Sequence, residues 1–340
     1  MKKVIIAALI VVVFILLGYL TLQNSDTPTE FMHPTTKYAL WSLLIGALVT
    51  ISLPLGAIAG LAFKPNTKTT SMFTAFGAGA LLAALSVELI GPTVEEIIGH
   101  INSPTGMAHD KKHAFTTMGA LIVGCLSGGF LFYALDELIN SKGGFLRKVG
   151  STITYIRHKK PHATIEEKDV RKVQKEEGHG EGGAPLAIWL GLLIDGIPES
   201  FVIGAGFLAL LAAKLSAGIT PEFTEVLPYT LIAGLFLSNF PEALSASIGM
   251  KKSGMSTTKI MFMWFSLVLI IAIGSLVGYY VGASIPHVIE IGIEGLAAGA
   301  MLTMIAQTMI PEAVHLGGAK VVGLSTLSGY LSAVAFKLLE

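Results

Sequence analysis

Apolar stretches of membrane-spanning length recur along the whole 340-residue chain. They cover roughly residues 4–20, 38–63, 71–97, 114–139, 185–213, 227–249, 258–283, 287–313 and 318–338. A helix needs about 20 mainly apolar residues to cross the core of a bilayer, so this pattern predicts a polytopic all-α membrane protein with nine spans. The first stretch follows Lys2 and Lys3 and is also compatible with a cleaved signal peptide. We favour a retained helix, because no clear small-x-small cleavage site follows it.

The composition agrees with a membrane protein and removes several other classes. Mean hydropathy is +0.70, and 52% of residues are hydrophobic whereas only 14% are charged. The formal net charge is zero, so nothing points to a nucleic-acid partner. The single Cys125 lies in an apolar stretch, which excludes a disulfide within the chain and a cysteine-based zinc site.

The distribution of Lys and Arg predicts the orientation. With the N-terminus in the cytoplasm, 18 of the 23 basic residues fall on the cytoplasmic side and 5 outside. Without the long polar segment at 140–184, the short segments still favour this orientation by 8 to 5. We therefore expect an integral protein of the cell membrane with its N-terminus in the cytoplasm and its C-terminus outside.

The segment at 140–184 is the only long polar one. It is charged, poor in aromatics and ends in glycines, so we expect a largely disordered cytosolic loop. Its scattered His158, His162 and His179 could bind metal weakly, but they form no ligand pattern, and a solvated linker is the simpler interpretation.

The apolar stretch at 191–204 carries two carboxylates and a proline. Asp195 and Glu199 are four residues apart, so a helix places them on one face. Pro198 has no N–H and leaves the carbonyl of Ile194 without its helical partner.

A second stretch, 235–245, repeats this pattern with Ser238, Asn239, Pro241 and Glu242. Ser238 and Glu242 again share a helix face. Each stretch thus offers a glutamate, a second oxygen-bearing side chain and a loosened backbone carbonyl. Oxygen donors of this kind predict a site for a divalent cation.

Asp195, Glu199 and Glu242 would together cost roughly 8–10 kcal/mol if they faced lipid, so we expect them to face protein or water. The simpler alternative is that each acid is protonated and hydrogen-bonds to a neighbouring helix. Other polar residues deep in spans or near span ends are possible members of a transport path: Glu88, Gln307, Thr308 and Glu312.

Two spans contain a short internal repeat. Residues 78–82 (AGALL) match residues 298–302 (AGAML), and the same alignment places Glu88 on Thr308. The predicted topology runs these spans in opposite directions, as in the inverted repeats of secondary transporters. Small residues also recur wherever membrane helices pack closely, which is the alternative explanation.

With these features the chain resembles the ZIP family of metal-ion transporters over nearly all of 38–338. Both Pro-Glu pairs, and the stretch from Ala298 to Glu312, match family helices. The resemblance implies eight core helices in a 3+2+3 arrangement, a homodimer, and uptake of zinc or similar divalent ions into the cytoplasm. The helix at 4–20 would precede the usual eight.

Several positions depart from the family pattern. Asp195 stands where the family usually has His, and Thr308 where it often has an acid. The other departures are Gly196, Ser200, Ser238, Asn239 and Ala243. They argue against a binuclear site and leave a single one, formed by Asp195, Glu199, Ser238 or Asn239, and Glu242. Without a nitrogen ligand, such a site favours Mn²⁺ or Fe²⁺ but does not exclude Zn²⁺.

The predicted organisation has five parts. They are an N-terminal membrane helix with an outside segment (1–37), a three-helix repeat (38–139), the cytosolic loop (140–184), a two-helix metal-binding unit (185–249) and a second three-helix repeat (250–340). The leading hypothesis is a divalent-metal transporter, and the alternative is a membrane metal sensor or scaffold that does not transport. We expect no enzyme and no prosthetic group, because nucleophile-elbow, HExxH, Gly-x-Gly-Asp and Walker A patterns are lacking.

Overall fold

The computed structural model describes residues 36–101, 108–141, 183–252 and 254–339. These residues are helical almost throughout, and no strand occurs among them. The predicted helix at 4–20 and nearly all of the predicted loop at 140–184 lie outside the described residues.

Eight segments within the described ranges are long and apolar enough to cross a membrane. They are Thr36–Phe63, Thr67–Ile101, Lys111–Glu137, Trp189–Ser216, Tyr229–Lys251, Thr257–Gly282, His287–Gly317 and Ala319–Leu339. Each coincides with one predicted span, with ends that differ by a few residues. The described chain is therefore all-helical, and its helices are consistent with an integral membrane protein.

These spans are built from fifteen helical elements. They are α2 (Thr36–Thr50), α3 (Ser52–Phe63), α4 (Thr67–Ala84), η1 (Leu85–Ile90), α5 (Gly91–Ile101), α6 (Ala108–Ser141), α9 (Gly183–Ser216), η3 (Phe223–Val226), α10 (Tyr229–Lys252), α11 (Thr257–Gly282), α12 (His287–Met304), η4 (Ile305–Met309), α13 (Ile310–Gly317), α14 (Ala319–Ala335) and η5 (Phe336–Leu339). The elements η1 and η4 are π-helical, whereas η3 and η5 are 3₁₀-helical.

Proline has different effects in different spans. The first span is divided at Ile51 into α2 and α3. Pro54 is the third residue of α3 and has no N–H to donate to the Thr50 carbonyl. Pro198 and Pro241, by contrast, lie inside α9 and α10 without dividing them. The two Pro-Glu pairs therefore sit on continuous helices.

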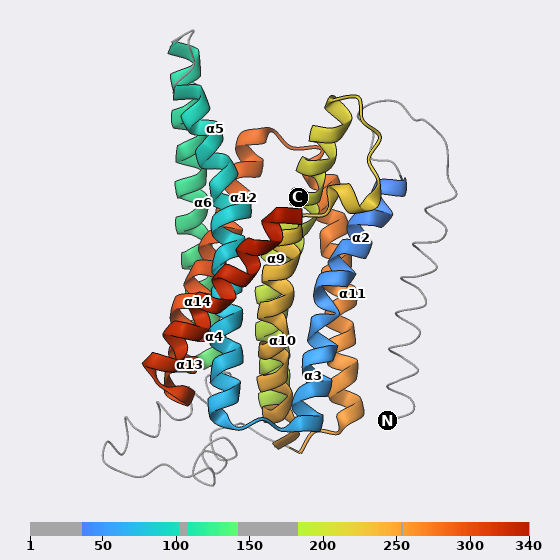
Figure 1. The fold of residues 1–340 in the computed structure, drawn as a ribbon, viewed down its shortest axis with the longest axis vertical. Helices are drawn as coiled ribbons and strands as arrows, with labels where there is room; N and C mark the ends of the chain where they lie inside the picture. The colour runs from blue at the N-terminus through green and yellow to red at the C-terminus, as the bar shows by residue number, and fades with distance from the viewer. Residues whose placement is uncertain (1–35, 102–107, 142–182, 253, 340) are drawn as a thin grey trace.

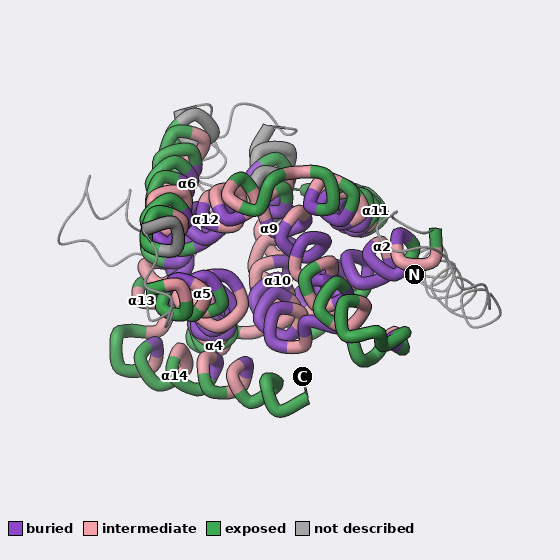
Figure 2. The backbone as a smooth tube through the Cα atoms, turned by 90° about the horizontal axis from the view of Figure 1, so that it is seen from above, coloured by how far each residue is buried: buried purple, intermediate pink, exposed green. Residues whose placement is uncertain are grey.

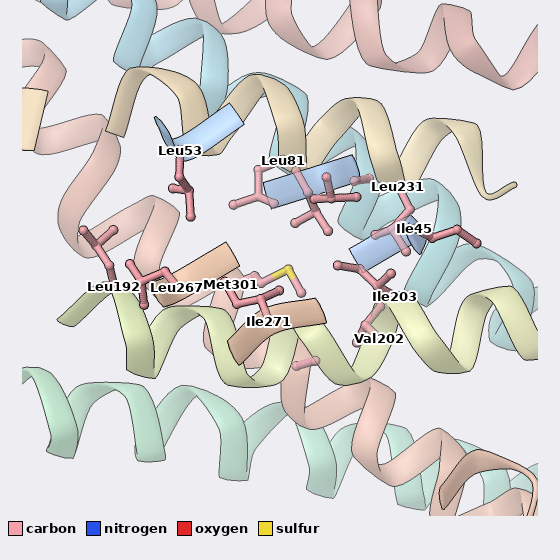
Figure 3. Packing of buried hydrophobic residues seen from close by; sticks show 14 of the residues in the cluster. Ile45, Leu53, Leu81, Leu192, Val202, Ile203, Leu231, Leu267, Ile271 and Met301 are labelled. Carbon is pink, nitrogen blue, oxygen red and sulfur yellow. The ribbon is translucent and has the colours of Figure 1, made fainter. Parts of the chain in front are cut away.

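Helices α9 and α10 lie side by side at the centre of the bundle, with α2–α3, α4, α11 and α12 around them (Figures 1 and 2). Helices α6 and α14 lie at the periphery, where much of their surface is exposed (Figure 2). In the core, Figure 3 shows aliphatic side chains of several helices turned toward one another. Among them are Ile203 of α9, Leu231 of α10 and Leu81 of α4, which are at most 1% exposed. The core thus fixes the two central helices from several sides.

The two spans that contain π-helical turns have matching registers. Helix α4 begins at Thr67 and α12 at His287, while η1 begins at Leu85 and η4 at Ile305. Both pairs are 220 positions apart, which is also the offset of the sequence repeat. A π-helical turn requires one extra residue in the helix, so its recurrence at the same place is a specific structural match.

Helix α4 packs closely against the last span, α14. A methyl group on Gly79 would collide with the backbone of Thr326, and one on Gly329 would collide with the backbone of Phe76. The absence of side chains at both glycines therefore allows direct backbone approach, as is common between membrane helices.

Helix α12 packs against α6 through the corresponding positions. A methyl group on Gly299 would collide with the backbone of Cys125, and one on Gly128 with that of Leu296. Gly299 and Leu296 of α12 are each 220 positions after their α4 counterparts, Gly79 and Phe76. Cys125 and Gly128 of α6 are each 201 positions before their α14 counterparts, Thr326 and Gly329. The two crossings therefore use the same set of contacts.

Candidate metal centres

Glu199 of α9 is almost completely buried, with 4% of its surface exposed. It follows Pro198 and lies one helical turn after Asp195, which is on α9 but whose side chain is outside the described part of the structure. The neighbouring Ser200 donates a hydrogen bond to the Ile197 carbonyl at 2.7 Å and packs against Gly274 of α11. Ser200 thus serves helix packing, and Glu199 is the described ligand candidate of α9.

Helix α10 contributes two buried polar side chains and one half-buried acid. Ser238 is 1% exposed, and its hydroxyl lies 3.9 Å from the Met309 sulfur of η4. Asn239 is 5% exposed, and its Nδ2 has no hydrogen-bond partner among the described residues. Buried amides normally have partners, so Asn239 marks a polar site within the bundle. Glu242 follows one turn after Ser238 and is half-buried.

One contact sets the relative height of α9 and α10. A methyl group on Gly206 of α9 would lie 3.6 Å from Leu231 Cδ2 of α10. These consecutive spans run antiparallel and lie side by side in both views (Figures 1 and 2). Glu199 lies seven residues before Gly206 on α9, and Ser238 lies seven residues after Leu231 on α10. Each is therefore about 10 Å from the contact along its helix axis, in the same direction. Glu199 and Ser238 therefore lie at about the same depth.

The same register continues four residues further. It places the backbone of Asp195 level with Glu242. Glu199 with Ser238, and Glu242 with the backbone of Asp195, thus lie in two adjacent layers of the α9–α10 pair. Pro198 also borders a cavity between α6, α9 and α12 that is lined by apolar residues and offers no oxygen or nitrogen side-chain ligand.

The possible path residues lie in different surroundings. Glu88 is in η1, and its Oε1 is 3.0 Å from Nζ of Lys337 in η5. Thr308 is half-buried and Gln307 is exposed, both in η4. Glu312 is buried in α13, at 6% exposed. The part of these four residues in a transport path stays a prediction.

A second group of ligand-type side chains was not predicted from the sequence. Glu96 and His100 of α5 and His113 of α6 each offer a ligand atom, and these atoms all lie within 4.8 Å of one another. It is the only such group of His, Cys, Asp and Glu found among the described residues. Glu96 and His100 are four residues apart, a spacing that could have indicated a shared face, but His113 belongs to the next helix, α6.

The α5–α6 group also contacts the start of α12. Nε2 of His287 is 2.9 Å from Glu96 Oε2, and its Nδ1 is 3.2 Å from Glu290 Oε2. Glu294, one turn further along α12, interacts electrostatically with these same groups. Three spans therefore meet at this polar cluster.

The fold is consistent with an integral membrane protein, and it holds polar, ligand-type side chains both inside the helical bundle and at one end of it. No protein-family model matches the chain, and no curated protein matches it.

Proposed function

We propose that this protein transports a divalent metal cation across the membrane into the cytoplasm, through a site between α9 and α10. The burial of Glu199, level with Ser238 on the antiparallel neighbour, carries the proposal. Its ligands would be Asp195, Glu199, Ser238 or Asn239, and Glu242. The resemblance to ZIP transporters, noted from the same residues, supports this assignment.

A bound cation accounts for the acids better than protonation alone. A carboxylate in the centre of a membrane costs roughly 2.5–3.5 kcal/mol on insertion scales, and neighbouring carboxylates repel one another. A divalent ion removes the repulsion and satisfies several oxygens at once. Protonated acids that hydrogen-bond across helices would explain the burial of Glu199, but not the second Pro-Glu pair in the adjacent layer.

An inverted repeat would supply the alternating access that transport needs. We propose a 3+2+3 arrangement with α2–α6 and α11–α14 as the two repeats. Its support is the constant 220-residue offset of the two π-containing spans and the matching contacts of α4 with α14 and of α12 with α6. In transporters of this type, the two repeats rock around a site near the midplane.

The donor set favours hard ions. Every proposed ligand in the α9–α10 layers binds through oxygen, which comes from a carboxylate, from the Ser238 hydroxyl or from the Asn239 amide. Carboxylate and carbonyl oxygens suit Mn²⁺ in particular, whereas imidazole suits zinc. We therefore propose manganese or iron as the preferred cargo, with zinc as a competing ion.

Metal uptake into proteoliposomes tests the proposal. Glu199→Gln and Glu242→Gln keep the side-chain shape but remove a charged ligand, so uptake at subsaturating Mn²⁺ should fall about tenfold or more. Glu95→Gln, an exposed acid on α5, is the matched control and should transport normally. Equal uptake by all four proteins would refute the proposal. Metal binding by the unaltered protein without any flux would instead favour a sensor or scaffold.

A further inference from the structure

A cluster of imidazoles and carboxylates lies where α5 ends and where α6 and α12 begin. It is separate from the α9–α10 layers and uses a different donor set. Its inner group, defined here as the α5–α6 cluster, is Glu96, His100 and His113.

The geometry of this cluster suits a metal ion. Glu96 Oε1 lies 3.7 Å from His100 Nε2, and the rings of His100 and His113 have centroids 4.7 Å apart at 41°. Ligands of one tetrahedral zinc ion lie roughly 3–4 Å from one another, given metal–ligand distances near 2.0–2.1 Å. Small rotations of the partly exposed side chains are therefore enough to bring the three donors onto one ion.

A supporting contact orients one of the imidazoles. His113 Nδ1 is 3.4 Å from the hydroxyl of Thr117, which is fully buried one turn further along α6. Histidine ligands usually hydrogen-bond through the ring nitrogen that does not bind the metal. With Nδ1 held by Thr117, Nε2 is the nitrogen of His113 that we expect to bind a metal.

A simple ion-pair network is the alternative explanation. Glu96 already binds His287 through Oε2, and His287 also contacts Glu290. This network uses the other oxygen of Glu96, however, and does not require two histidines of different helices to have their rings in contact. Like-charged imidazolium rings would repel one another, whereas neutral rings can share one cation.

We propose that Glu96, His100 and His113 form a metal site for a borderline transition-metal ion of the zinc or cobalt class, with His287 of α12 within reach as a fourth ligand. Two imidazoles and one carboxylate are a donor set that binds zinc in proteins and leaves one position open. Such a site prefers zinc over manganese, in contrast to the oxygen ligands of α9 and α10. It does not depend on the proposed transport function.

Cobalt binding to the purified full chain in detergent tests this site, because tetrahedral Co²⁺ absorbs visible light much more strongly than octahedral Co²⁺. The background protein should carry Glu199→Gln and Glu242→Gln to remove the α9–α10 acids. It should also carry His158→Ala, His162→Ala and His179→Ala, to remove three histidines outside the described residues that could bind metal weakly. This background should bind one Co²⁺ with a tetrahedral spectrum, whether or not the unaltered protein transports metal.

His100→Ala with His113→Ala should then weaken Co²⁺ binding by more than about 100-fold and abolish the spectrum, since loss of even a supporting partner costs 10–100-fold. His315→Ala, at an exposed position on α13, is the matched control and should have no effect. Unchanged binding in the double variant would overturn the proposal. So would X-ray absorption that shows only oxygen ligands around Co²⁺ in the background protein, a result that needs no histidine variant to fold.

Discussion

Gly77 of α4 offers a direct test of how closely α4 supports the α9–α10 site. A methyl group at this position would lie 2.9 Å from the Leu237 carbonyl oxygen, 3.0 Å from Pro241 Cγ and 3.0 Å from Ser238 Cα. Ordinary contact begins at 3.4 Å, so Gly77→Ala would push α4 and α10 apart by about 0.5 Å (3.4 − 2.9). The obstructing atoms belong mainly to the α10 backbone, which cannot rotate away.

This displacement should affect both stability and metal binding. Overpacking of this size costs about 1–3 kcal/mol, offset in part by the 0.5–1 kcal/mol by which alanine favours a helix over glycine. We expect a net loss of about 1–2 kcal/mol and a melting temperature lower by a few degrees. A misplacement of 1 Å in a binding site can cost about 100-fold in function, so half that distance should weaken Mn²⁺ binding about tenfold.

Thermal unfolding and Mn²⁺ calorimetry in the same detergent measure the two effects. Gly323→Ala on α14 is the control, because a methyl group there meets nothing within 4 Å. It should melt at or above the temperature of the unaltered protein and bind Mn²⁺ normally. If Gly77→Ala bound Mn²⁺ as tightly as Gly323→Ala and melted no lower, α4 would not pack against the Pro241 region as the structure has it.

Two further predictions concern the charged groups. Asp195→His, which introduces the residue usual at this place in the ZIP family, should raise the ratio of Zn²⁺ to Mn²⁺ affinity, because imidazole suits zinc better than carboxylate does. Competition binding at fixed pH measures this ratio. An unchanged ratio would mean that Asp195 is not a ligand. The single variant Lys337→Gln should melt at a lower temperature than the double variant Lys337→Gln/Glu88→Gln. The single change leaves the Glu88 carboxylate, which is 11% exposed, without its 3.0 Å contact. Equal melting temperatures would show that this ion pair contributes nothing to stability.

The spans themselves were predictable, because long apolar runs record burial in lipid whatever the helices pack against. Their internal breaks were not. The division at Ile51 and the π-helical turns depend on local hydrogen-bond register, which apolar composition does not encode. The Pro-Glu layers were found from spacing within one helix, and the structure added their relative depth through Gly206.

Contacts between distant parts of the sequence escaped prediction for a different reason. Glu88 was named as a possible path residue from its depth in the span alone, and its contact with Lys337 joins residues that are far apart in the chain. The α5–α6 cluster combines an i,i+4 pair with a histidine of the next helix, and only the packing of α5 on α6 brings His113 to it. Such sites require tertiary structure, because no spacing along one helix specifies them.

The matching contacts of the two halves make their difference in charge informative. The alignment that places Gly79 on Gly299 also places Glu88 on Thr308, and the offset of 201 between α6 and α14 places Lys337 on Asp136. The crossing of α4 with α14 therefore has a carboxylate paired with an ammonium group, where the equivalent positions at the crossing of α12 with α6 have a hydroxyl and a carboxylate. If the halves exchange conformations as we propose, identical halves would give the outward-open and inward-open states equal energies. Because an ammonium group stands at these positions in one crossing and a carboxylate in the other, we expect the two states to differ in energy even without metal, and the bound cation to act on an equilibrium that is already biased.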